Sequence, residues 1–127
     1  MIEVQLKDII SSPEVLNEIA KKDLKARPAY KLARVMREID REFSLFQENR
    51  KQLISKYADK DEKGNIKYNK DGNITVEKDK IDLFNNEIEE LLNTSIQLNV
   101  DLIELNDIED VNFTPQQMNI LSLFIKE

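Results

Sequence analysis

The sequence predicts one α+β domain over residues 1–127. We expect a long antiparallel helical pair with a protruding β-hairpin, plus a small sheet from the N- and C-terminal strands and short flanking helices. Three observations predict this fold. Apolar residues recur at alternating spacings of four and three in two long segments, they alternate with polar residues near both chain ends, and a Gly- and Asn-containing segment separates the long helices. The length fits a single domain.

The N-terminal segment predicts a strand followed by a helix. Ile2, Val4 and Leu6 alternate with polar residues, which is typical of a half-buried strand. Ser12 and Pro13 then favour a helix start. A Ser side chain can accept a hydrogen bond from a free backbone N–H, and Pro at the first helical position loses none. We expect this helix to end near Lys22.

A long helix is predicted over residues 28–57. Its apolar seam has the spacings 4, 3, 4, 3, 4, 3 and 4, with one polar interruption. The seam consists of Leu32, Met36, Ile39, Phe43, Phe46, Arg50, Leu53 and Tyr57. Two interpretations of the interrupting arginine remain: its head reaches solvent and pairs with Glu87 or Glu90, or it fixes the register of the helix.

A third helix is predicted around Ile81, Phe84, Ile88 and Leu91, with Asp79 as its N-cap. Because its spacing matches that of the long helix, we expect an antiparallel pair. The register would place Phe84 near Leu53 and Ile88 near Arg50.

Residues 58–78 predict a β-hairpin inserted between the two long helices. The sequence at 63–66 recurs in similar form at 71–74, and residues 69–73 have the Asn, Asp and Gly content of a turn. A calcium loop is excluded, because each register would place lysines at positions where oxygen ligands are required.

The C-terminal third predicts another strand, from Ile96 to Leu102, and a bulge or bend where the alternation changes phase at Ile103. Thr114, Pro115 and Gln117 predict a capped helix start. Residues 4–9 and 103–108 are similar and each precedes such a start. Two strand–turn–helix units could therefore pair in one small sheet, although chance also explains so short a similarity.

The last predicted helix has apolar residues on nearly all sides. Its own domain can cover one face, and a second subunit would cover the other, so we expect a homo-oligomer; the alternative is a central core helix. Its candidate partner-binding residues are Ile120, Leu123 and Phe124.

The charge distribution is uneven. The net charge is −6, yet residues 21–56 hold 11 Lys and Arg against 5 Asp and Glu, whereas residues 82–127 hold one Lys against 10 Asp and Glu. The two segments either neutralise each other within the domain or present faces of opposite sign.

The basic side of the long helix is a second candidate partner-binding surface. It could meet phosphates or an acidic protein, or it could be a solvated face paired with acidic residues of the same chain. Nucleic acid is the less favoured partner, because we find no aromatic residue for base stacking beside it. The residues concerned are Arg27, Lys31, Arg34, Arg37 and Arg41.

No constellation of residues predicts an enzyme. The chain has no Cys and no His, which excludes thiol nucleophiles, Ser-His dyads and zinc sites with those ligands. The carboxylate pairs Glu87/Glu90 and Asp107/Asp110 lie in charged runs typical of a solvated surface. We therefore expect a non-enzymatic protein with no cofactor, no catalytic residue and no metal site. We expect no signal peptide and no membrane span.

The order of these features resembles a family of small uncharacterised proteins encoded by phages and prophages of low-GC Gram-positive bacteria. The similar segments are the opening strand and residues 29–34, 56–66, 84–92 and 113–127. The resemblance implies a phage-related origin and no activity. The two charge blocks, the protruding hairpin and the apolar terminal helix lead us to expect a phage or prophage protein-interaction module in the host cytoplasm that binds, and could inhibit, a host or defence protein. The alternatives are a virion or tail-assembly component and a protein that binds or mimics nucleic acid.

Overall fold

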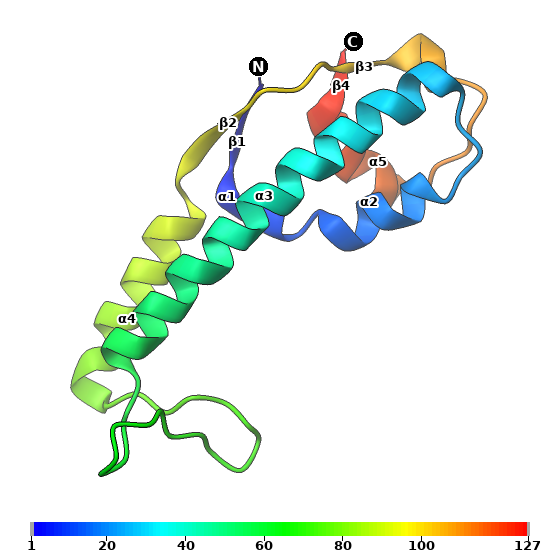
Figure 1. The fold of residues 1–127 in the computed structure, drawn as a ribbon. Coiled ribbons are helices and arrows are strands. Elements are labelled where there is room, and N and C mark those ends of the chain that lie inside the picture. The colour runs from blue at the N-terminus through cyan, green and yellow to red at the C-terminus, as the bar shows by residue number, and fades with distance from the viewer. Residues whose placement is uncertain (1, 127) are drawn as a thin grey trace. The chain divides into compact units, whose positions relative to one another are not determined.

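The computed structural model describes residues 2–126 and divides them into two compact units (Figure 1). The terminal unit contains the described residues up to Phe43 together with those from Thr94 onward, and the central unit is Ser44–Asn93. Helix α3 (Ala26–Tyr57) contributes residues to both. The α+β class predicted from the sequence is therefore confirmed, with long helices and a small antiparallel sheet.

The terminal unit begins with strand β1 (Ile2–Gln5), helix α1 (Leu6–Ile10) and helix α2 (Pro13–Ala20). The predicted strand is confirmed as far as Gln5, but Leu6 already begins α1, which the sequence did not predict. The helix start at Pro13 is confirmed. The predicted role of Ser12 is wrong: its hydroxyl makes no cap bond and instead donates to the backbone carbonyl of Asp8. Ser12 already has helical backbone angles, φ −86° and ψ −34°, so its side chain points back along the chain.

Helix α3 confirms the long predicted helix, although it begins two residues before Pro28. A proline is tolerated there because first-turn N–H groups have no partner within a helix. The face it turns to the core differs in detail from the predicted seam. Val35 is fully buried at 0% exposure, whereas Met36 is only partly buried.

Two small sheets replace the single predicted sheet. Strand β1 pairs antiparallel with β2 (Ser95–Leu98), and β3 (Ile103–Glu104) pairs in parallel with β4 (Ile125–Lys126). The strand predicted from Ile96 to Leu102 ends at Leu98, and residues 99–102 separate it from β3, which begins at Ile103, where we predicted a bulge or bend. The similarity between residues 4–9 and 103–108 has a structural counterpart, since each segment is a strand that passes directly into a helical turn, α1 or η1 (Leu105–Ile108).

The C-terminal segment starts with the predicted capping box. Thr114 Oγ1 accepts from the Gln117 N–H at 3.1 Å, and Gln117 Oε1 accepts from the Thr114 N–H at 3.0 Å. The predicted terminal helix is shorter than expected, however, because α5 (Pro115–Leu121) passes into a 3₁₀ turn, η2 (Ser122–Phe124), and then into β4. This change of geometry turns Phe124 into the core, where it is 1% exposed.

The hydrophobic core of the terminal unit draws on all of its strands and helices except β4, whose Ile125 packs against it from outside. Helix α2 packs against α5, and Gln117 Nε2 donates to Glu18 Oε2 across that contact at 3.4 Å. The core residues are Val4, Ile9, Val15, Leu16, Ile19, Leu32, Val35, Ile39, Leu98, Val100, Ile103, Ile108, Leu121 and Phe124. Full burial of each such side chain contributes about 1.5–3 kcal/mol, so this cluster dominates the stability of the fold.

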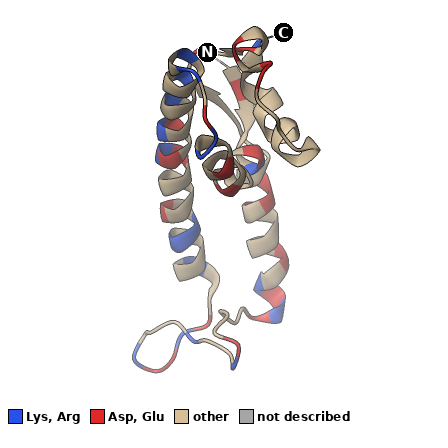
Figure 2. Ribbon diagram, turned by 90° about the vertical axis from the view of Figure 1, so that its right-hand side faces the viewer, with Lys and Arg blue, Asp and Glu red and all other residues tan. Residues whose placement is uncertain are grey.

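The central unit contains the C-terminal part of α3 and helix α4 (Lys78–Leu92), which lie side by side and antiparallel (Figures 1 and 2). The Phe84 ring meets the Tyr57 ring edge-on, with 6.1 Å between centroids, one helical turn beyond the Leu53 that we predicted as its neighbour. The predicted N-cap at Asp79 is wrong: Glu77 occupies that position, without a side-chain cap bond. Helix α4 has no buried residue.

The segment between α3 and α4 has two similar turns in series, where the sequence predicts one hairpin. Asp61 Oδ1 accepts from the N–H groups of Lys63 and Asn65, and eight residues later Asn69 Oδ1 accepts from those of Asp71 and Asn73. Positive φ angles of 82° at Gly64 and 81° at Gly72 complete the turns. Three isolated antiparallel bridges stand in place of continuous hairpin strands, because the second turn interrupts them.

Candidate functional site

The exposed face of α3 in the terminal unit carries a regular line of large basic and aromatic side chains. We call these five residues, Arg27, Tyr30, Arg34, Arg37 and Arg41, the basic stripe. Their spacings are 3, 4, 3 and 4, so at about 100° per residue they fall within a sector of about 80°. All five are exposed, on the side of the helix opposite the buried Leu32, Val35 and Ile39. The stripe is about 21 Å long at a rise of about 1.5 Å per residue.

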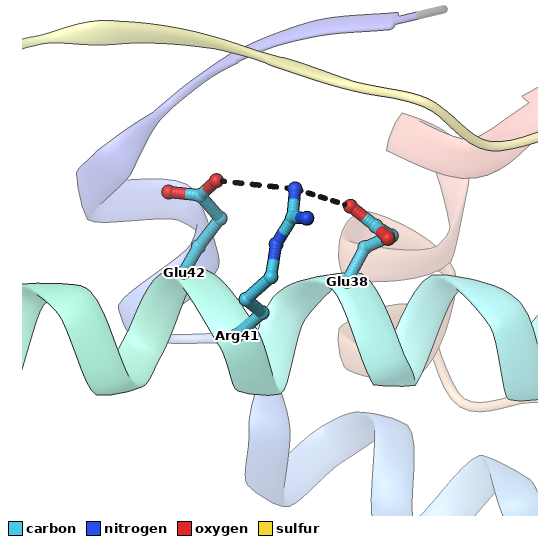
Figure 3. A network of polar contacts seen from close by, with 3 residues as sticks. All are labelled: Glu38, Arg41 and Glu42. Atoms are coloured by element: carbon cyan, nitrogen blue, oxygen red, sulfur yellow. Dashed lines mark hydrogen bonds and ion pairs between the residues drawn. The ribbon is translucent and has the colours of Figure 1, made fainter.

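Two arginines of the stripe are held by carboxylates of the same unit. Arg41 Nη2 lies 2.9 Å from Glu38 Oε2 and 4.0 Å from Glu42 Oε1 on the same helix (Figure 3). Arg34 Nη1 lies 3.8 Å from Asp101 Oδ2. Exposed pairs of this kind contribute about 0–1 kcal/mol each, so an incoming carboxylate could exchange with them at little cost.

The other two arginines have no such partner. In the described residues no ion pair or hydrogen bond from the side chain of Arg27 or Arg37 is found. Their charges face solvent at either side of Arg34. They are therefore the positions at which an external anionic group would meet the least competition from the protein itself.

Lys31 does not belong to this exposed line. Its side chain is half-buried, and Nζ donates to the backbone carbonyl of Leu102 at 3.1 Å. Together with Lys25, which lies 3.9 Å from Asp110, it ties the start of α3 to the acidic C-terminal third. The Lys25–Asp110 pair, like that of Arg34 with Asp101, neutralises part of the basic segment with the acidic segment of the same chain.

Tyr30 is a member of the stripe that the sequence analysis missed. It is 67% exposed and lies between Arg27 and Arg34, three residues after the one and four before the other. The expectation that no aromatic residue lies beside the basic side is therefore wrong. The 3, 4, 3 spacing would have found it, had that spacing been tested on polar positions as well as on apolar ones.

The apolar residues predicted to bind a partner at the C-terminus lie largely within the terminal unit. Phe124 is a core residue, and Ile120 and Leu123 are partly buried and packed against the core. The alternative of a central core segment describes them better. The exposed apolar surface that motivated a second subunit is thus absent at these three residues.

Two cavities of the terminal unit are lined mostly by apolar side chains. One, of about 310 Å³, lies between the end of α2 and the start of α3, where Lys22 and Asp23 are its ionisable residues. Lys22 Nζ is also placed 5.6 Å from the centre of the Phe113 ring. The other, of about 340 Å³, is lined by η1 and by residues near Phe113 and Met118. Within residues 2–126, no cluster of three or more potential metal-ligating side chains is present.

In the central unit, the ionisable residue with an altered pKa is Lys56. A hydrogen bond with Tyr57 and the nearby charge of Glu87, at 3.7 Å, raise the pKa of the Lys56 ammonium group. Glu87, one of the two carboxylates predicted to pair with Arg50, thus pairs with Lys56 instead. Lys56 is exposed and Glu87 is half-buried, which is typical of a structural contact at the surface.

The comparisons with known proteins give no relative. No family model matches the chain, and no curated protein or solved structure matches it. Across the described part of the chain, no helix is long and apolar enough to cross a membrane.

Proposed function

We propose that this protein is a non-enzymatic protein-interaction module that binds its partner through the basic stripe of α3. The observation that supports the proposal is the exposed line of four arginines and one tyrosine on a helix whose opposite face is anchored in the core. Arg and Tyr are enriched among the residues that dominate binding at protein interfaces. A rigid helix also presents them without a large loss of conformational freedom on binding.

A protein suits this surface better than a nucleic acid does. Carboxylates lie beside Arg34 and Arg41, and the net charge of the chain is −6, so a phosphate backbone would meet repulsion along with attraction. Tyr30 offers a ring on which a base could stack, which keeps nucleic acid as the second candidate. A protein partner can offer carboxylates to the four arginines and an apolar contact to the Tyr30 ring, so its surface can be complementary to all five residues of the stripe.

The resemblance to phage and prophage proteins suggests where such a partner would be found. A host or defence protein, which the module would bind and inhibit, fits a role in the host cytoplasm. A phage protein would fit a role in the virion or in tail assembly. Both roles use the same surface, so the test of the stripe does not depend on which is correct.

The proposal is tested by affinity purification from a host lysate, followed by mass spectrometry. The wild-type protein is compared with the double variant Arg27→Glu/Arg37→Glu and with Lys51→Glu, which reverses a single positive charge at an exposed position of α3 outside the stripe. We expect a partner that wild type and Lys51→Glu retain and the double variant loses, while circular dichroism shows that all three are folded. A partner retained equally by all three proteins would contradict the proposal.

A further inference from the structure

Helix α4 and its C-cap residue, Asn93, carry a line of exposed acidic and amide side chains with the same spacing as the basic stripe. We call these five residues, Asp79, Asp82, Asn86, Glu89 and Asn93, the acidic stripe. Their spacings are again 3, 4, 3 and 4, and all five are exposed. The stripe runs along the side of α4 opposite Phe84, Ile88 and Leu91, which are partly buried in the central unit. Figure 2 shows acidic residues recurring along this helix.

The two stripes have complementary charge and equal length. Each spans 14 residue steps, so each is about 21 Å long. In the described residues Asp79, Asp82 and Glu89 have no ion pair, as is also the case for Arg27 and Arg37.

Each stripe also has an apolar neighbour. Tyr30, 67% exposed, lies within the basic stripe, and Leu83, 54% exposed, lies beside the acidic stripe. Two helices that lie alongside each other with such spacing bring side chains of the two stripes into contact along their full length.

We propose that the acidic stripe of one copy of this protein binds the basic stripe of a second copy. This inference rests on the proposed function, because it names the partner of the same surface. The interface joins two different patches, so a dimer leaves one basic and one acidic stripe free, and further copies can add to form a ring or an open chain. Charge complementarity makes the association sensitive to salt.

Sedimentation velocity over a range of protein concentrations tests the charge pairing. At an ionic strength of about 0.05 M we expect reversible association, which is lost at about 1 M, where the Debye length is about 3 Å. Arg27→Glu/Arg37→Glu and Asp79→Lys/Asp82→Lys should each weaken association by about tenfold or more, because like charges then face each other. The controls are Lys51→Glu and Glu62→Lys, each of which reverses one exposed charge outside the stripes and should leave association unchanged.

Restored complementarity gives the stronger test. A chain carrying all four substitutions again has stripes of opposite sign and should associate as the wild type does. An equimolar mixture of the two double variants should associate as well. A wild-type protein that stays monomeric at low ionic strength, or a fourfold variant that is folded but monomeric, would overturn the inference.

Disulfide cross-linking tests the geometry. Arg34 and Asn86 are the central residues of the two stripes, so they meet whichever way the two helices run. Because the chain has no cysteine, Arg34→Cys and Asn86→Cys each introduce a single thiol. The two single-cysteine proteins are mixed and oxidised, and the control mixture is Lys51→Cys with Asn86→Cys. We expect the yield of the 34–86 disulfide to exceed the yield of the 51–86 disulfide by about tenfold or more. A tenfold excess corresponds to a contact worth about 1.4 kcal/mol. Equal yields would overturn the inference.

The outcomes separate this inference from the proposed function. If the wild type is monomeric but a lysate partner is still lost on reversal of the basic stripe, self-association is wrong and the proposed function stands. If the monomer instead binds a duplex DNA of mixed sequence through Arg27 and Arg37, both are wrong.

Discussion

The terminal unit and the central unit share helix α3 but bury very different amounts of apolar surface. In the terminal unit the core cluster includes residues from three strands and from every helix and 3₁₀ turn. In the central unit the buried apolar side chains among the described residues are Phe46 and Ala58, and Ile81 and Leu83 of α4 are exposed. The difference follows from the number of elements around α3, because one neighbouring helix covers a narrow stripe and several cover a broad face.

This contrast indicates that the two parts of helix α3 differ in stability. Regions with few buried contacts open at lower free energy than the main core does. The terminal unit therefore supplies most of the stability and holds the basic stripe rigid. The central unit contains α4, whose outer face is charged. This helix buries little apolar area. The predictions below test this contrast, from the largest effect to the smallest.

The largest effect is expected at Val35. Val35→Asp places an unpaired charge in the core of the terminal unit, at a cost comparable to the whole stability of about 5–15 kcal/mol, and should unfold the protein. Met36→Asp, which the predicted seam would make as severe, should cost less because Met36 is only partly buried. Thermal unfolding followed by circular dichroism measures both. Equal melting temperatures for the two variants would contradict the assignment of the core face.

A smaller effect is expected at the capping box of α5. Thr114→Ala removes the acceptor for the Gln117 N–H and should lower the free energy of unfolding by about 1 kcal/mol. Thr114→Ser keeps the acceptor and serves as the matched control. Urea denaturation measures the change, and a loss equal in the two variants would show that the hydroxyl is not the stabilising group.

A local effect is expected in the turns of the central unit. At Gly72 the φ angle is 81°, and a Cβ would meet no atom within 4 Å, so Gly72→Ala suffers only the backbone strain of about 1 kcal/mol. If the central unit is the less stable of the two, this strain should raise amide exchange in residues 69–73 and leave the melting temperature almost unchanged. A fall in melting temperature as large as that for Thr114→Ala would mean that the units unfold together.

The smallest effect concerns Lys56 and pH. Its pKa is raised in the folded state, chiefly by Tyr57 and then by Glu87, so its contribution is complete below the ordinary value of 10.5 and is lost as pH rises through the folded pKa. The difference in unfolding midpoint between wild type and Lys56→Met should therefore be constant across neutral pH and shrink only above about pH 10.5. A change near pH 7 would contradict this assignment.

Local patterns in the sequence predicted the elements that depend on neighbouring residues. The spacing of four and three predicted α3 and α4, the alternation at Ile2 and Val4 predicted β1, and Thr114 with Gln117 predicted the capping box in atomic detail. Each of these is decided within a few residues, where propensity and periodicity act directly.

The features that the sequence did not predict depend on contacts between distant residues. Val35 was missed because the seam assumes one partner helix, whereas the terminal unit surrounds α3 on a broader face. The parallel pairing of Ile103 with Ile125 joins segments too short to show a period. For the candidate site, the four arginines of the basic stripe were predicted from their positions along one side of the long helix. Tyr30 is the exception, because the local spacing of the stripe already contains it. The inward turn of Phe124 depends on the 3₁₀ turn of η2.

Native-state hydrogen exchange along α3 tests the contrast between the units most directly, because one continuous helix passes from one unit into the other. We predict that amides of residues 32–39 exchange only through global unfolding, while those of residues 47–54 exchange faster, through a lower-energy opening of the central unit. The basic stripe would then lie on the rigid half of the helix. Uniform protection from residue 32 to residue 54 would contradict the account, since the two units would then form one cooperative structure.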